Sequence, residues 1–165
     1  MSAGSELRHD DPAAQPLEDR EEGLRVCHAN PERGLGVETL VARRAGEVIH
    51  RFTGDIGPEL LLHTLQVGPD AHISNTRFIG FLLHSCAPNC RLDMATFELV
   101  ALEDVRAGGL LTIDYAATED RLYRQFACHC GAPHCRRWIT GRAEPVNAEG
   151  REWLALGEAS WGEGS

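Results

Sequence analysis

Apolar residues in this 165-residue chain occur mostly in short alternating runs, separated by glycine, proline and charged residues. Runs of this kind are typical of short β-strands. Residues 36–41 and 47–52 form one candidate pair of strands, joined through a turn that contains glycine. Residues 97–102 and 110–113 form a second candidate pair with the same kind of connection. The pattern therefore predicts a mainly β fold.

Three segments have apolar residues at helical spacing and predict short helices. Residues 58–65 begin with a proline, which suits the first turn of a helix. Residues 76–83 form a second candidate. Residues 148–156 form a third, with Trp153 available for packing. We expect the last residues, 157–165, to fray.

The amino-terminal residues differ in composition from the rest. Residues 1–22 contain seven acidic and two basic residues and few apolar ones, which predicts disorder. The chain is long enough for one domain with its own core. The boundaries that we predict are a disordered acidic tail at 1–22, the main domain at 23–120, a cysteine-rich segment at 121–141 and a carboxyl-terminal extension at 142–165.

The formal net charge is −9, and all 16 basic residues are arginine, so the chain contains no lysine. An acidic surface disfavours direct binding to nucleic acid and favours a basic peptide or protein as partner. No apolar run reaches the length of a membrane span, and the polar start does not resemble a signal peptide. We expect a cytoplasmic protein, or a nuclear one in a eukaryote, whose six cysteines are metal ligands or free thiols.

Three cysteines within eight residues predict a metal site. Cys128, Cys130 and Cys135 are separated by Gly131 and Pro133, which allow the backbone to turn tightly. Structural zinc prefers four tetrahedral ligands, so one more ligand must come from elsewhere. The candidates for it are Cys86, Cys90, His129 and His134. The alternative is a cluster of thiols without metal.

Three motifs occur in a fixed order: Leu-His-Ser-Cys-Ala-Pro-Asn-Cys at 83–90, Leu-Thr-Ile-Asp-Tyr at 111–115 and Cys-His-Cys-Gly-Ala-Pro-His-Cys at 128–135. In this order they resemble the signature of SET-domain protein-lysine methyltransferases, over residues 34–138. The resemblance implies a SET fold, which is mainly β with a few short helices. This fold has small antiparallel sheets and a threaded, pseudoknot-like crossing of residues 80–90 beside Tyr115. A post-SET zinc segment follows it.

The resemblance also implies roles for individual residues. Tyr115 is the expected catalytic residue, Phe52 and Ile113 are expected to line the channel for the substrate lysine, and Cys86 is the expected fourth zinc ligand. Packing in the core is the alternative for Tyr115 and for Ile113.

The cofactor that the resemblance implies is S-adenosylmethionine. Residues at seven positions are expected around it: Gly34, Leu35, Gly36, Leu83, His84, Phe126 and Trp138. Core packing is the alternative for at least one of Phe126 and Trp138. The chain departs from the family at Leu83, where an asparagine is expected, and at Gly80, where an arginine is usual. An apolar side chain at Leu83 offers no oxygen to the ammonium group of the cofactor.

Three functions remain open at this point. The first is an S-adenosylmethionine-dependent protein-lysine N-methyltransferase acting on a basic protein. The second is a SET-like binding module that has lost turnover, because Leu83 and Phe52 replace polar groups. The third is an enzyme that uses the same cofactor on a small amine or another nucleophile.

Overall fold

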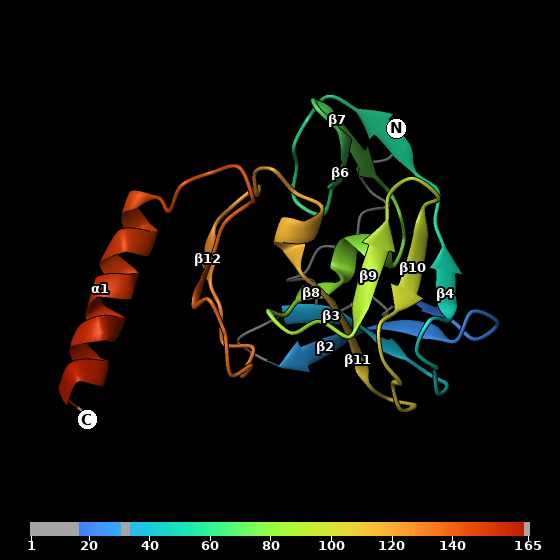
Figure 1. The fold of residues 1–165 in the computed structure, drawn as a ribbon. Coiled ribbons are helices and arrows are strands. Elements are labelled where there is room, and N and C mark those ends of the chain that lie inside the picture. Colours follow the sequence, from blue (N-terminus) through green and yellow to red (C-terminus); the bar gives the residue numbers. More distant parts are fainter. Residues whose placement is uncertain (1–16, 31–33, 164–165) are drawn as a thin grey trace.

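The computed structural model describes residues 17–30 and 34–163, and it describes the side chains of these except Asn30 and residues 158–163. The fold consists of small β-sheets, two 3-10 helices and one α-helix in this part of the chain. Figure 1 shows the sheets gathered into one body, with the α-helix at one side of it. The mainly β prediction is confirmed.

The largest sheet has five strands in the order β1-β2-β3-β11-β8. Its strands are Glu18–Asp19 (β1), Leu24–Asn30 (β2), Gly34–Thr39 (β3), Leu110–Ile113 (β11) and Leu83–His84 (β8). The strand β1 pairs with β2, so the disorder predicted for residues 1–22 is wrong for this part of the segment. Residues 1–16 lie outside the described residues.

Two three-stranded sheets and one two-stranded sheet complete the β structure. The first contains Val48–Arg51 (β4), Glu98–Ala101 (β10) and Cys90–Asp93 (β9). The second contains Asp55–Gly57 (β5), Ala71–Ser74 (β7) and Leu65–Gly68 (β6). The two-stranded sheet pairs Phe126–Ala127 (β12) with Trp138–Ile139 (β13).

The predicted strands are present, but they do not pair with each other as the two hairpins that the sequence predicted. The strand β3 pairs with β2 and β11, whereas β4 pairs with β10. The connection between β3 and β4 is held by a bridge between Arg43 and Val105, which directs the two strands into different sheets.

The helical predictions have mixed outcomes. The prediction of a helix at residues 58–65 is wrong, because this segment is irregular and ends in β6. Within residues 76–83 only Ile79–Phe81 forms a 3-10 helix, η2. The third helix is confirmed and longer than expected, at Ala148–Glu163 (α1), and the Asn147 side chain accepts a hydrogen bond from Gly150 N at its start.

The crossing predicted around residues 80–90 is present. The strand β8 lies parallel to β11, with Leu83 opposite Thr112 and His84 opposite Ile113. Beyond β8 the Asn89 side chain donates to Leu110 O at 2.9 Å and accepts from Thr112 N at 2.9 Å. A second 3-10 helix, η3 (Tyr115–Ala117), follows β11 directly. These bonds hold the segment that follows β8 alongside β11 and close to Tyr115.

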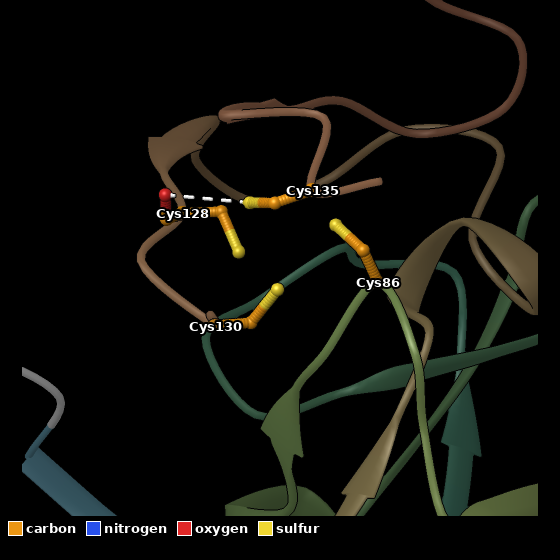
Figure 2. Close-up of side chains that lie close together, drawn as sticks. All are labelled: Cys86, Cys128, Cys130 and Cys135. Carbon is orange, nitrogen blue, oxygen red and sulfur yellow. Dashed lines mark hydrogen bonds between the residues drawn. The ribbon is translucent and has the colours of Figure 1, made fainter. Parts of the chain in front are cut away.

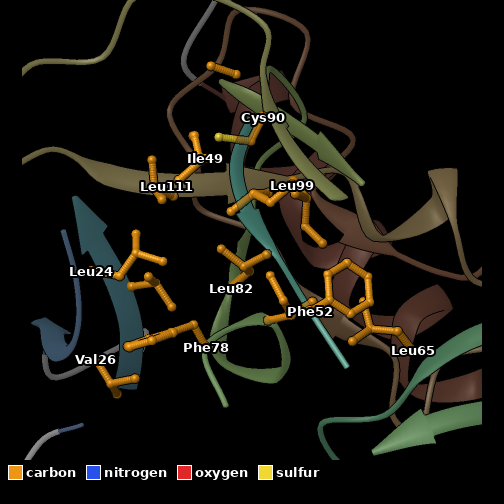
Figure 3. Packing of buried hydrophobic residues seen from close by; sticks show 14 of the residues in the cluster. Leu24, Val26, Ile49, Phe52, Leu65, Phe78, Leu82, Cys90, Leu99 and Leu111 are labelled. Carbon is orange, nitrogen blue, oxygen red and sulfur yellow. The ribbon is translucent and has the colours of Figure 1, made fainter. Parts of the chain in front are cut away.

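The main hydrophobic core lies between the five-stranded sheet and the two three-stranded sheets. Figure 3 shows part of this cluster, in which Leu24, Phe78, Leu99 and Leu111 are completely buried. Cys90 belongs to it as well, at 1% exposure. The core thus supports the strands that position Tyr115 and His84.

The helix α1 packs on the cysteine-rich segment through Trp153. The Trp153 ring lies 6.2 Å from the Trp138 ring and 5.3 Å from the Arg137 guanidinium. A Cβ at Gly150 would lie 2.2 Å from the Trp138 indole nitrogen, so only glycine permits this close approach. No helix in the described residues has the length and apolar character needed to cross a membrane.

Candidate active site and metal centre

Four cysteines from two distant segments meet in one cluster. The sulfur atoms of Cys86, Cys128, Cys130 and Cys135 all lie within 4.8 Å of one another. Figure 2 shows the four side chains converging on a common point. The grouping is the one that the sequence predicted from the spacing and the family resemblance.

The backbone places each cysteine by local hydrogen bonds. Cys128 N donates to Arg137 O at 2.7 Å, across the β12–β13 pair, and Cys135 N donates to Ala132 O at 3.1 Å. Cys86 follows β8, and its sulfur accepts a hydrogen bond from Arg136 N at 3.3 Å. The cluster therefore joins the segment at residues 128–135 to the crossing beside Tyr115.

The thiol environments differ within the cluster, because burial raises the pKa of Cys86 and Cys128. Burial alone would raise the pKa of Cys130, but backbone N–H groups and neighbouring thiols that hydrogen-bond to its sulfur bring the pKa down to about 6. In contrast, burial in the core raises the pKa of Cys90 to about 12. Cys90 belongs to the main hydrophobic core and is not one of the four cysteines whose sulfurs converge.

The geometry fits a tetrahedral zinc ion. With each Zn–S bond at about 2.3 Å, the four sulfurs of such a site lie about 3.8 Å apart. Sulfurs that already approach within 4.8 Å need only small side-chain adjustments to reach this arrangement. Neither His129, which packs on Trp153, nor His134, whose Nε2 lies 3.1 Å from Cys86 O, belongs to the group of four.

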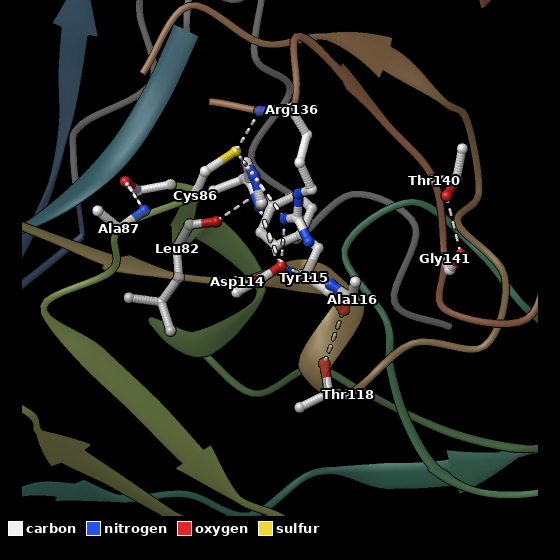
Figure 4. Close-up of polar contacts among 12 residues, drawn as sticks. Leu82, Cys86, Ala87, Asp114, Tyr115, Ala116, Thr118, Arg136, Thr140 and Gly141 are labelled. Atoms are coloured by element: carbon white, nitrogen blue, oxygen red, sulfur yellow. Dashed lines mark hydrogen bonds and ion pairs between the residues drawn. The ribbon is translucent and has the colours of Figure 1, made fainter. Parts of the chain in front are cut away.

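Tyr115 lies beside this cluster and is fixed at both ends. Its hydroxyl donates to Leu82 O at 2.5 Å, and its backbone N–H donates to His84 Nδ1 at 3.1 Å (Figure 4). The rings of Tyr115, His84 and Phe126 pack edge to face, with centroids 5.2 to 5.9 Å apart. The phenol is therefore held in one orientation.

A cavity of about 300 Å³ opens on Tyr115. Ile113 and Phe126 line it, and so do six leucines: Leu60, Leu61, Leu62, Leu65, Leu82 and Leu122. Leu61, Leu62 and Tyr123 are about half exposed, so the cavity has an open, apolar rim. Ile113 and Tyr115 thus line the same cavity, and Ile113 also belongs to the main hydrophobic core.

The glycines expected near the cofactor, Gly34 and Gly36, are not among the residues that line this cavity. Gly34 has φ +75°, and no atom of the described residues lies within 4 Å of the position a Cβ would take, so these residues leave its backbone open there. At Gly36 a Cβ would lie 2.8 Å from the Leu83 Cδ1 atom. Gly36 thus packs closely against the Leu83 side chain, which a larger residue at this position would have to displace.

Two aromatic residues differ from their expected setting. Phe52 is 3% exposed and packs on Phe97 in the main core, with ring centroids 5.5 Å apart, so it does not line the cavity. The prediction of Phe52 as a channel residue does not fit this cavity. Trp138 is 6% exposed, and its indole N–H donates to Gln125 Oε1 at 2.9 Å. Its packing against Trp153 gives it a structural role.

Sequence reasoning missed three polar residues of this region. Arg136 donates to Asp114 Oδ1 at 2.6 Å, and this carboxylate also accepts from Ala116 N in the first turn of η3. Glu119 lines the cavity and is 6% exposed. The one available signal was the placement of Asp114 and Glu119 on either side of the Tyr115 turn.

Curated relatives are methyltransferases. The chain is 30% identical to Methyltransferase flvH of Aspergillus flavus over 137 residues, which cover 81% of this chain and 77% of that protein. It is 29% identical to the probable histone-lysine N-methyltransferase lin-59 of Caenorhabditis elegans over 140 residues, which cover 72% of this chain but only 10% of that protein. No family model matches the chain.

Solved structures agree with these relatives. The chain resembles the crystal structure of KRYPTONITE in complex with mCHG DNA and SAH, with a TM-score of 0.57 and 26% identity. The match covers 70% of this chain and 28% of that one. The chain thus spans most of one curated relative and a small part of the larger proteins.

Proposed function

The chain belongs to the SET-domain family of S-adenosylmethionine-dependent methyltransferases, and we propose that it transfers methyl groups to the ε-amine of a lysine in a protein. The observation that carries the proposal is the placement of Tyr115. Its ring forms a wall of an apolar cavity, while Leu82 O holds its hydroxyl at 2.5 Å. We propose Tyr115 as the catalytic residue.

The reaction asks the protein mainly for alignment. Methyl transfer to an amine is an in-line displacement, so a rigid phenol oxygen beside the methyl group can orient it through weak C–H···O contacts. The amine must also be neutral, although at neutral pH a lysine with a pKa of about 10.4 is almost entirely protonated. A cavity lined by leucines disfavours the charged form and so assists deprotonation.

We propose that the cofactor lies against the open backbone of Gly34 and against the residues that follow β8. When bound, S-adenosylmethionine supplies an electrophilic methyl group on a sulfonium. The residues that would hold it are Gly34, Leu35, Gly36, Leu83, His84 and Phe126, with Trp138 behind them. Of these, His84 and Phe126 already contact the Tyr115 ring, which brings the two halves of the proposed site together.

We propose one zinc ion with a structural role at Cys86, Cys128, Cys130 and Cys135. Bound there, it would close the post-SET segment, residues 121–141, over the domain at residues 23–120. The carboxyl-terminal extension, residues 142–165, would then support this segment through Trp153.

The proposed partner is a basic protein that presents a lysine. A net charge of −9 favours such a partner and disfavours a direct contact with nucleic acid. With a histone as substrate the protein would act in the nucleus, and with another protein in the cytoplasm.

A small amine is the second candidate substrate. The relative that this chain spans most fully, flvH, is named a methyltransferase without a protein substrate. The cavity of about 300 Å³ would also accommodate a free amine of moderate size.

One experiment separates the proposed functions. Zinc-loaded protein is titrated with S-adenosylmethionine by calorimetry and then incubated with a lysine-rich protein mixture and with a set of small amines. Mass spectrometry follows the products, without background from this chain because it contains no lysine. Methylated lysine in protein supports the proposal, and methylation confined to small amines favours the second candidate. Cofactor binding without any product indicates a binding module and contradicts both.

A further inference from the structure

A buried carboxylate lies in the wall of the otherwise apolar cavity. Glu119 is the only acidic residue among the described residues that line it, and it is 6% exposed. Its two carboxylate oxygens lie 2.9 and 3.2 Å from Gln66 N, which donates to them. Burial raises the pKa of Glu119, and the hydrogen bond from Gln66 acts in the opposite direction. A carboxylate is costly to bury, and the hydrogen bonds from Gln66 N and the Thr118 side chain offset part of this cost.

The backbone ties Glu119 to the catalytic side of the cavity. Glu119 N donates to Tyr115 O at 3.0 Å, so the two residues belong to the same turn, at η3 and its end. Arg142 N donates to Glu119 O at 2.9 Å and fixes the turn from the other side. Glu119 therefore has a fixed position relative to Tyr115.

The negative charge of Glu119 is not cancelled by an ion pair within the described residues. Arg142, the cation that lowers its pKa through space, bonds instead to Asp120 at 2.7 Å and to Ala117 O at 2.9 Å. Arg124 also lines the cavity, but its side chain is exposed at the rim. Among the other polar groups of the wall, the hydroxyls of Thr64 and Thr118 donate to backbone carbonyls, and His63 Nδ1 lies 2.8 Å from Gly80 O. Glu119 is thus the group in the wall that can receive a cation.

Any amine substrate reaches this cavity as a cation. A primary amine with a pKa of about 10.4 is well over 99% protonated at neutral pH. Transfer of an ammonium group from water to a cavity lined by leucines is unfavourable unless a negative group compensates for the lost hydration. A bound cation would in turn favour the ionised form of the carboxylate.

From these observations we propose that Glu119 determines substrate specificity, by binding the incoming ammonium group at the cavity wall and so restricting the site to amines. This inference rests on the proposed function, because it takes the cavity as the entrance for the methyl acceptor. The chemical class of ligand is a primary alkylammonium ion, whether it is carried by a protein lysine or by a small molecule. The first contact with the substrate is then electrostatic. Deprotonation and alignment at Tyr115 follow once the amine has left Glu119, because a nearby carboxylate favours the charged form.

The test compares a cation with a neutral molecule of the same shape. Zinc-loaded protein is titrated with n-pentylammonium and with 1-pentanol, and binding is followed by nuclear magnetic resonance. We expect the wild-type protein to bind the ammonium ion more tightly than the alcohol. Glu119→Gln should weaken binding of the ammonium ion at least tenfold and leave the alcohol unchanged, because glutamine keeps an oxygen for the Gln66 N–H group.

The matched control is Glu103→Gln, which removes the same charge from an exposed position outside the cavity. It should leave both affinities within twofold of wild type. Equal losses for both ligands in Glu119→Gln would show a structural role and overturn the proposal. No loss, or no binding of pentylammonium to the wild-type protein, would overturn it as well.

Failure of the Glu119 proposal and failure of the proposed methyltransferase function give different results. Charge-selective binding that depends on Glu119, without methyl transfer to any amine, would support the recognition site and contradict the enzyme. Methyl transfer to lysine that is unaffected by Glu119→Gln would support the enzyme and contradict the recognition site.

Discussion

The guanidinium of Arg136 donates a hydrogen bond of 2.6 Å to the carboxylate of Asp114, the residue directly before Tyr115. Arg136 follows the last cysteine of the cluster, and Asp114 caps the turn η3 by accepting from Ala116 N at 3.0 Å. The pair thus links the cysteine segment to the turn that carries the proposed catalytic residue. Figure 4 shows this link together with the bond from Arg136 N to the Cys86 sulfur.

Arg136→Gln should weaken catalysis while destabilising the fold only slightly. The two side chains are 42% and 26% exposed, so the pair contributes about 0.5–1 kcal/mol to stability. If this free energy is lost from the transition state, the rate falls by up to about fivefold. Enzyme kinetics and zinc content are measured together, and zinc should remain bound.

The control for this variant is Arg51→Gln, which breaks an exposed ion pair with Glu98 at 2.8 Å on another sheet. It should leave kcat unchanged. Equal effects of the two variants would mean that the Arg136–Asp114 pair has no special connection to the site.

Removal of zinc should unfold the post-SET segment. We expect one zinc per chain by elemental analysis, since the four sulfurs already converge within 4.8 Å. Cys86→Ser should lose the metal and lower the thermal stability, because metal binding and local folding are coupled. Cys27→Ser, a half-buried cysteine outside the cluster, is the matched control and should keep the metal. A fully folded protein without metal, or one that needs Cys90 as a ligand, would refute the site.

Leu83→Asn should tighten the binding of S-adenosylmethionine. A hydrogen bond to a charged group contributes about 1.5–3 kcal/mol, up to about a hundredfold in affinity. The structure adds a cost, because Leu83 is 9% exposed and packs on Gly36, so the melting temperature should fall. Calorimetric titration and thermal melting are measured on the same samples, with Leu102→Asn, at an exposed leucine, as control. Equal or weaker cofactor binding by Leu83→Asn would show that another residue contacts the ammonium group.

Ile113 should set how many methyl groups are added. It is 3% exposed and lines the cavity beside Tyr115, and it can hold no water molecule that would crowd out further methyl groups. We expect the wild-type enzyme to form di- or trimethyllysine and Ile113→Tyr to stop mainly at monomethyllysine. Ile113→Phe adds the ring without the hydroxyl, so a comparison with Ile113→Tyr separates the effect of side-chain size from that of hydrogen bonding. Mass spectra over a time course decide, and a wild-type reaction that ends at one methyl group would refute the role.

The sequence predicted the parts of the site that depend on motifs and missed those that depend on packing. The four cysteines, Tyr115 and His84 come together as expected, because β8 and β11 pair in the predicted crossing. Glu119 was missed because a Thr-Glu-Asp run is typical of an exposed loop. Its burial results from a contact with Gln66, more than 50 residues away, which no local pattern contains.

The wrong helix at residues 58–65 has a physical explanation. Its leucines have helical spacing because they line a cavity, with Leu61 and Leu62 half exposed at the rim. The Thr64 hydroxyl bonds to the backbone N–H and C=O groups of Leu61, and His63 has φ +71°, so a tight turn replaces the helix. A periodic pattern of apolar residues indicates that one side of a segment is apolar. A segment that lines a cavity can show this pattern without forming a helix.

The most direct test of the account is methyl transfer by the wild-type protein and by Tyr115→Phe. Zinc-loaded protein, S-adenosylmethionine with a deuterated methyl group and a lysine-rich protein mixture are combined, and peptides are analysed by mass spectrometry. The substitution removes a hydroxyl that bonds to Leu82 O, at a cost to stability of about 1 kcal/mol. We predict labelled lysine with the wild-type protein and a loss of at least a hundredfold in rate with Tyr115→Phe, at unchanged cofactor affinity. Equal rates for the two proteins, or no labelled amine with either, would contradict the assignment of Tyr115 as the catalytic residue of a lysine methyltransferase.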